Sequence, residues 1–169
     1  MEVRRLVLLF MFFSMAIILM GLSGQSEAGK NRFAGTYFTI GDEDGIPTPV
    51  IIQIGKDGSY TTVFGIQNTT LAGIVFTNDV GTWKRIGKNE IIAKTFSISA
   101  LPPTESSDGE VVSNCIADHV ITFSNNFQEI SLTVSGKCYA PDVNPADPGD
   151  APIINGFSGS FQGKRLNVP

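Results

Sequence analysis

The chain has little of what many catalytic and metal-binding sites are built from. Among its 169 residues there are one histidine, His119, two cysteines and one tryptophan. A single histidine excludes a site built from several histidines, and a metal centre would need more histidine or cysteine than this sequence supplies. We therefore expect neither a metal ion nor a bound cofactor.

Charge is also sparse. Asp, Glu, Lys and Arg make up 17% of the residues, and the formal net charge is −4. The sequence has no basic cluster of the kind that binds nucleic acid or an anionic membrane surface. We expect no nucleic acid as a partner and no membrane in the mature form.

One long apolar run, Leu6–Leu22, follows two arginines near the N-terminus. Ser26 and Ala28 then occupy the small-x-small positions that signal peptidase recognises, so the pattern predicts a secretory signal cut after Ala28. An uncleaved anchor is the alternative, although the run is slightly shorter than the roughly 20 apolar residues that span a bilayer. Cleavage leaves residues 29–169 as a single domain in the periplasm or outside the cell.

Helical periodicity is almost absent after this segment. Runs of β-branched and aromatic residues alternate instead with clusters of Gly, Asn, Asp and Pro, which is typical of strands joined by turns. Short links such as Asp57-Gly58 predict antiparallel hairpins. The predicted strands are Gly35–Ile40, Pro49–Ile54, Ser59–Ile66, Val80–Ile86, Glu90–Ser99, Val111–Phe123, Glu129–Tyr139 and Gly156–Leu166.

Eight antiparallel strands in a domain of this length predict an all-β fold, an eight-stranded antiparallel up-and-down β-barrel. A two-sheet sandwich is the alternative. The interior of such a barrel is just wide enough for side chains or for one small ligand. The longer links include 67–78 and the proline-rich 140–155.

The two cysteines lie on neighbouring predicted strands. Apolar residues alternate cleanly along 129–139, and Cys138 belongs to the apolar set. A register that pairs Cys115 with Cys138 also pairs His119 with Val134 and brings the two core-facing sets together, whereas a slip of one residue would separate them. Since an exported protein lies in an oxidising compartment, we predict a Cys115–Cys138 disulfide.

His119 faces inward in this register. It is either a core histidine satisfied by a hydrogen bond, a polar anchor in a ligand cavity, or a general base. Glu110 and Asp118 are carboxylates near it in the sequence. Asp118 has the wrong parity to share the face of His119, which weakens the catalytic interpretation.

The predicted first and last strands carry a family resemblance. Gly35-x-Tyr37 opens the first strand, and Arg165 lies on the last. This resembles the lipocalins and the wider calycin group, whose barrels open with Gly-x-Trp and carry an arginine packed over that ring; it is also similar to allene-oxide-cyclase-like barrels. Tyr37 stands where the family has tryptophan, and the one tryptophan here is Trp83, on the fourth predicted strand. The resemblance implies an exported carrier of a small hydrophobic molecule.

Three functions are therefore compared. A carrier would bind its ligand in the barrel. An interaction or inhibitor module would have a filled barrel and present loops 67–78 and 140–155 to a protein partner. A cyclase or isomerase would use His119 as acid or base. We expect binding rather than catalysis, and a cavity that reaches His119 would distinguish the first and third functions from the second. The predicted ligand-binding residues are His119, Tyr37, Phe64, Phe96, Phe123 and Trp83.

Overall fold

The chain divides after Arg32 into two units, and the second begins at Phe33. The computed structural model describes residues 32–43, 46–65, 75–102 and 109–167. The predicted signal segment 1–28 lies outside these residues. None of the described segments forms a helix long and apolar enough to cross a membrane.

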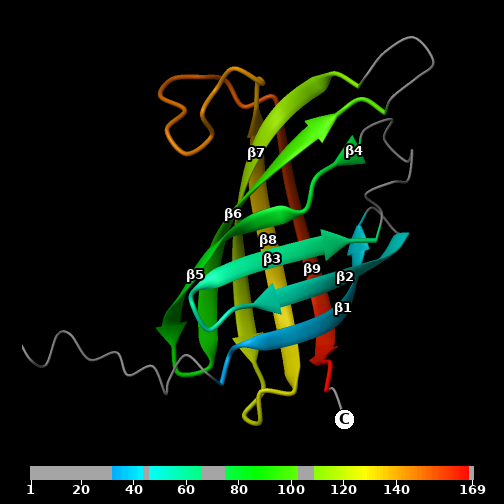
Figure 1. Cartoon of the computed structure of the whole chain (residues 1–169), viewed down its shortest axis with the longest axis vertical. Coiled ribbons are helices and arrows are strands. Elements are labelled where there is room, and N and C mark those ends of the chain that lie inside the picture. The colour runs from blue at the N-terminus through cyan, green and yellow to red at the C-terminus, as the bar shows by residue number, and fades with distance from the viewer. Residues whose placement is uncertain (1–31, 44–45, 66–74, 103–108, 168–169) are drawn as a thin grey trace, which may run out of the picture. The chain divides into compact units, whose positions relative to one another are not determined.

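The described part of the second unit is built from β-strands (Figure 1). Its strands are β1 Gly35–Glu43, β2 Ile46–Ile54, β3 Ser59–Phe64, β4 Val75–Phe76, β5 Asp79–Gly87, β6 Glu90–Ala100, β7 Val111–Phe123, β8 Glu129–Tyr139 and β9 Asn155–Arg165.

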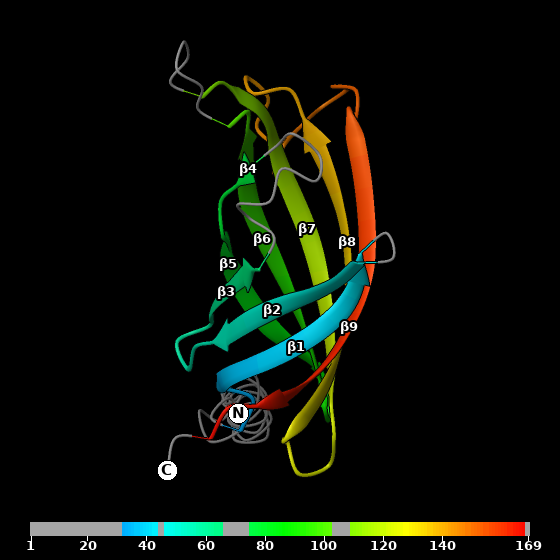
Figure 2. The same cartoon turned by 90° about the vertical axis from the view of Figure 1, so that its right-hand side faces the viewer.

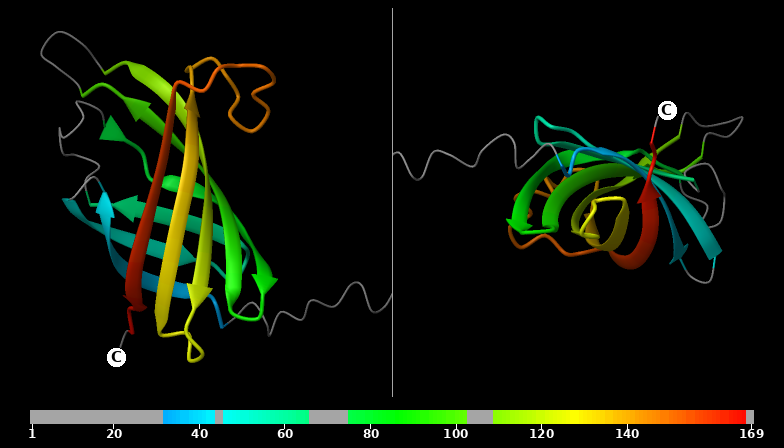
Figure 3. Two further views of the ribbon diagram at one scale, coloured as in Figure 1. Left: turned by 180° about the vertical axis from the view of Figure 1, so that it is seen from behind. Right: turned by 90° about the horizontal axis from the view of Figure 1, so that it is seen from below.

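Eight of these strands close into an antiparallel barrel, which confirms the predicted fold. Around the barrel the order is β1-β2-β3-β5-β6-β7-β8-β9, and β9 pairs with β1 to complete the ring (Figure 2, Figure 3). A closed ring excludes the sandwich alternative. β4 pairs with Ser99 and Ala100, beyond the part of β6 that pairs with β5. β4 and β5 thus run along the same side of β6, as two parts of one interrupted strand.

The barrel has two unlike ends. Short turns join β2 to β3, β5 to β6 and β7 to β8 at one end, where β9 also finishes; we call this the closed end (Figure 2). The longer β6–β7 and β8–β9 links lie at the opposite end, the mouth (Figure 2). In the β2–β3 turn, Gly58 has a φ of 93°, the left-handed region that residues other than glycine rarely adopt. The prediction of a hairpin at Asp57-Gly58 is confirmed.

The β7–β8 register is the predicted one. Cys115 lies opposite Cys138, His119 opposite Val134, and the pairing continues to the closed end of the hairpin. The two sulfur atoms form a disulfide with a bond length of 2.06 Å. Because both cysteines are buried and lie toward the mouth, the bridge ties two long strands together where the barrel opens.

Aromatic rings fill the closed end. Phe33 is completely buried, and its ring centroid lies 5.0 Å from that of Phe123, 5.3 Å from that of Phe127 and 5.9 Å from that of Trp83. Tyr37 extends this group, with its ring centroid 5.7 Å from that of Phe123. These five residues form the closed-end cluster. Their side chains fill the interior at the closed end.

Arg165 lies over Tyr37, as the resemblance implies. Its guanidinium carbon is 5.7 Å from the centroid of the tyrosine ring, a distance at which a cation is attracted to an aromatic face. Arg165 Nη2 also donates a hydrogen bond to the carbonyl of Ala34. The tyrosine hydroxyl donates to the carbonyl of Phe33 over 3.1 Å. The first and last strands are therefore joined by side chains as well as by the backbone.

Candidate functional site

The interior is hollow toward the mouth. A cavity of about 230 Å³, here called the mouth pocket, is lined by side chains from β3 to β9. Its apolar wall comprises Phe64, Phe76, Val134, Phe157, Phe161 and the Cys115–Cys138 bridge, and its polar groups belong to Asp79, Ser97, Ser99, Asn155 and Ser158. A mostly apolar wall with a few polar groups is the usual composition of a ligand site.

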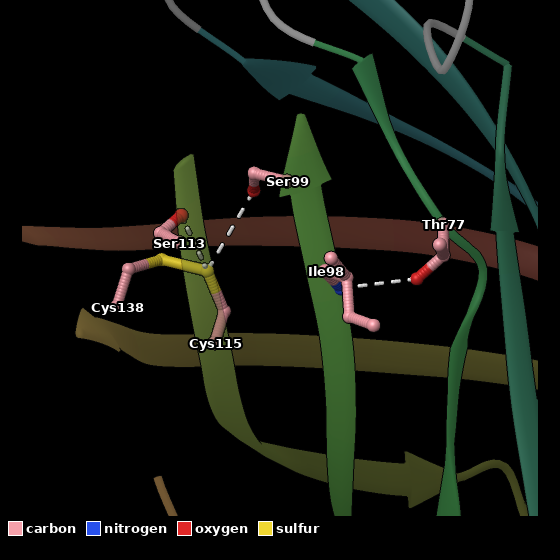
Figure 4. Close-up of a disulfide and its surroundings, with 6 residues drawn as sticks. All are labelled: Thr77, Ile98, Ser99, Ser113, Cys115 and Cys138. Atoms are coloured by element: carbon pink, nitrogen blue, oxygen red, sulfur yellow. Dashed lines mark hydrogen bonds between the residues drawn. A yellow bond between two sulfur atoms is a disulfide. The ribbon is translucent and has the colours of Figure 1, made fainter. Parts of the chain in front are cut away.

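Hydrogen bonds hold the wall of the mouth pocket beside the disulfide (Figure 4). The hydroxyl oxygens of Ser99 and Ser113 lie 3.8 and 3.7 Å from Cys115 Sγ. Thr77, which lies between β4 and β5, accepts a hydrogen bond of 3.0 Å from the backbone amide of Ile98 on β6. Strands β4 to β7 are thus cross-linked at this level of the barrel.

A network of buried polar side chains lies at the base of the mouth pocket. His119 Nδ1 is 3.2 Å from the hydroxyl of Tyr60, and its Nε2 is 3.1 Å from the hydroxyl of Thr95 and 3.3 Å from Asp79 Oδ2. Thr62 donates a hydrogen bond of 3.1 Å to the same Oδ2. All five residues are at most 5% exposed. Of the five, Asp79 is the one that also lines the pocket.

The hydroxyl of Tyr60 keeps its proton at physiological pH. Burial raises the pKa of Tyr60 well above its usual value, and the charge of Asp79 raises it further. Tyr60 is therefore a neutral phenol that forms a hydrogen bond with His119 Nδ1.

This arrangement predicts a loss of stability at alkaline pH. The unfolded chain ionises Tyr60 near pH 10, whereas the folded chain retains the proton, so the stabilisation is complete below about pH 10 and falls as pH rises further. One such group lowers the free energy of unfolding by up to about 1.4 kcal/mol per pH unit. Tyr60→Phe should reduce this dependence on pH. Part of it should remain, because burial also raises the pKa of Tyr37. Urea unfolding between neutral and alkaline pH measures the slope in the wild type and in Tyr60→Phe, and identical slopes would contradict the raised pKa of Tyr60.

The predicted ligand-binding residues separate into several groups. Phe64 lines the mouth pocket. His119 does not line it, but contacts the lining residue Asp79. Tyr37, Trp83 and Phe123 belong to the closed-end cluster, where they fill space.

Phe96 is not an interior residue. It lies on the outer face of β6, 37% exposed, and pairs with Val80, which is also exposed. The prediction that Phe96 lines the interior is therefore corrected. The neighbouring Thr95, of opposite parity, is the inward residue at this point of β6.

The carboxylate beside His119 is not one of those near it in the sequence. Asp118 faces outward and forms an exposed ion pair of 3.0 Å with Lys94, and Glu110 is exposed before the start of β7. The carboxylate in contact is Asp79, at the start of β5. Asp79 and the buried Trp83 are four positions apart on the same strand, so their side chains point to the same face. This alternation is the pattern in the sequence that could have predicted an inward Asp79.

The two loops considered for a protein partner are described to different extents. In the first, residues 67–74 lie outside the described part, and β4 follows them. The second is attached to β7, because the side-chain amide of Asn114 donates hydrogen bonds of 2.7 and 3.3 Å to the carbonyls of Pro141 and Val143. It contains no strand before Asn155, as its prolines predict.

The geometry limits what the site can do chemically. The imidazole of His119 is fully buried and is not part of the pocket lining. A molecule in the mouth pocket would contact Asp79, and the histidine would act on it only through that carboxylate. The arrangement therefore suits the holding of a polar group better than direct proton transfer by His119.

The chain matches no protein-family model, and its sequence matches no curated protein.

Proposed function

We propose that this chain is an exported, lipocalin-like barrel that binds a small molecule in the mouth pocket. The pocket itself carries the proposal, because it combines an aromatic wall with a buried carboxylate at its base. The alternative of an interaction module depends on a filled barrel, whereas the described interior is filled from the closed end up to the buried residues around His119 and holds the mouth pocket beyond them.

The volume of the pocket restricts the size of the ligand. Sites for drug-sized ligands enclose roughly 300–1,000 Å³, whereas the mouth pocket has about 230 Å³. The buried polar residues around His119 close the base of the pocket, so a longer molecule cannot reach deeper. We therefore expect a compact ligand, such as one ring with a short side chain, rather than a long-chain lipid.

Two further observations support the location and the family. A disulfide is characteristic of proteins that fold outside the cytoplasm, which fits the predicted signal segment and the Cys115–Cys138 bridge. The packing of Arg165 over Tyr37 corresponds to the arginine-over-aromatic arrangement of lipocalins. Export and lipocalin-like character are proposed on these grounds.

A blocked pocket provides the test. Ser97→Phe places a ring within the mouth pocket, and Ser135→Phe places the same ring on the exposed outer face of β8 as a matched control. We expect NMR titration with phenethyl alcohol to give saturable shifts around Val134 in the wild type and in Ser135→Phe, and none in Ser97→Phe. Native mass spectrometry of protein from its own host would then identify the natural ligand. If neither neutral nor charged probes shift pocket residues of the wild type, the proposed function is wrong.

A further inference from the structure

A carboxyl side chain lies at the base of the mouth pocket. Thr62 donates a hydrogen bond to Asp79 Oδ2, and His119 Nε2 lies 3.3 Å from the same oxygen. The side chain of Asp79 is 7% exposed and contributes to the pocket lining. Buried charges are normally paired, because an isolated carboxylate loses its hydration without compensation. A positive group of a ligand in the pocket would give this side chain a further partner.

The cationic side chains that the structure pairs with carboxylates do not neutralise Asp79. Lys94 is paired with Asp118 on the outer surface, and Lys164 with Glu129. Among the described residues that line the mouth pocket, Asp79 is the one ionisable side chain. A cationic ligand would therefore meet an acidic side chain there, whereas a ligand carboxylate would meet no cationic one.

The wall above Asp79 suits a cation as well. Phe64 meets Phe76 at an interplanar angle of 71° and Phe161 at 69°, with ring centroids 6.0 and 6.1 Å apart. In each pair the edge of one ring lies against the face of the other, so the three rings form one connected aromatic wall. Phe157 joins them by lying against Gly136, where a Cβ atom would collide with the ring. Aromatic faces attract ammonium groups, and a wall of several rings is a recognised way to bind them.

We propose that the mouth pocket binds a small organic cation, a primary or quaternary ammonium with an apolar body, whose charged group lies against Asp79. The inference rests on the proposed function and adds the chemical class of the ligand. The hydroxyls of Ser97 and Ser99, which also line the pocket, can accept the remaining N–H bonds of a primary ammonium. The apolar body then packs on Phe157 and Val134 toward the mouth.

Matched probes separate charge from shape. Phenethylamine, phenethyl alcohol and phenylacetate have similar bodies and carry a positive, a neutral and a negative end. Binding to the full-length protein is measured by isothermal titration and by NMR. We expect the amine to bind at least about tenfold more tightly than the alcohol, the margin of one charge-assisted hydrogen bond, and phenylacetate to bind least.

Asp79→Asn tests the carboxylate and keeps its shape. This variant should bind the amine and the alcohol equally, whereas Asp118→Asn, which removes an outward carboxylate, should keep the full preference. Phe157→Leu is a second variant at a partly exposed position; because leucine keeps an apolar contact but removes the aromatic face, it should weaken tetramethylammonium binding severalfold and alcohol binding by a smaller factor. The wild-type probe series and Phe157→Leu test the proposal even if Asp79→Asn fails to fold.

The outcomes distinguish the two proposals. Equal wild-type affinities for amine and alcohol would overturn the cation inference and leave small-molecule binding in place. An amine preference that survives in Asp79→Asn would also overturn it, because the cation would then be held elsewhere. Absence of binding by every probe would overturn the proposed function itself.

Discussion

Replacing His119 with leucine should lower the free energy of unfolding by about 3–5 kcal/mol, the usual cost of leaving a buried charge without its partner. The imidazole contacts Tyr60, Thr95 and Asp79, and all of these are buried. Leucine fills a similar volume but offers no hydrogen bond, so the phenol and the carboxylate lose their partner at once. Urea unfolding, followed by the fluorescence of the buried Trp83, measures the change.

The control removes the whole polar group. A triple variant, Tyr60→Phe, Asp79→Leu and His119→Leu, should recover most of the stability, because well-packed apolar residues often replace buried ionic groups without loss. It should also lose amine binding. Recovery of stability without recovery of binding would show that the network is kept for the ligand rather than for the fold. A change below about 1 kcal/mol in the single variant, within the range of a surface substitution, would contradict the described network.

Replacing both cysteines with alanine should cost about 3 kcal/mol. The bridge joins residues 23 positions apart, and the chain-entropy model assigns a loop of this size about 3 kcal/mol of stabilisation at room temperature. Cys115 and Cys138 also line the mouth pocket, so we expect weaker ligand binding together with lower stability. Unfolding in urea and titration with phenethylamine measure the two effects separately.

Reduction of the wild type is the matching control for this double variant. Treatment with a thiol reductant should bring the wild type close to the stability of Cys115→Ala/Cys138→Ala and leave the variant unchanged. Alkylation without reductant should modify neither cysteine of the mature protein. Two reactive thiols under those conditions would show that the bridge does not form.

Much of the barrel could be predicted because several local patterns agree. Along β8, apolar and polar residues alternate without exception from Ile130 to Val134, which defines the core face. The position of Cys138 on that face then determines the register with β7, since any odd slip would turn one cysteine outward. Turn chemistry at Asp57-Gly58 supplied the strand direction. Each of these signals lies within one hairpin.

The carboxylate of the site was missed because it comes from a distant strand. Asp79 reaches His119 across β6, although 40 positions separate them in the sequence. A search among neighbours in sequence finds Glu110, which precedes the strand, and Asp118, which the alternation of the strand turns outward. The predicted strand also began at Val80, one residue too late to include the aspartate. Continuing the alternation from Trp83 back to residue 79 would have predicted an inward Asp79. It would not have predicted the contact with His119.

The wrong placement of Phe96 has a different cause. The outer face of this part of the barrel is itself apolar, with Val80, Phe96 and Ile98 all exposed. Alternation identifies the core face only when the other face is polar. The inward residues nearby are Thr95, Ser97 and Ser99. A prediction that places the more hydrophobic residues inside therefore assigns the wrong face of β6 to the interior. Polar interior positions of this kind are what a binding barrel requires, and composition alone does not reveal them.

The pairing of β1 with β9 has a consequence for how the chain folds. Every other junction of the ring joins strands that are close in the sequence, whereas this one joins Tyr37 to Arg165. Contacts between distant residues form late, because the entropy of closing a long loop must be overcome first. Until they form, β1 and β9 each have an unpaired edge that can pair with another chain. The contacts of Arg165 with Tyr37 and Ala34 lie at this junction, so weakening them should slow barrel closure and promote aggregation during refolding.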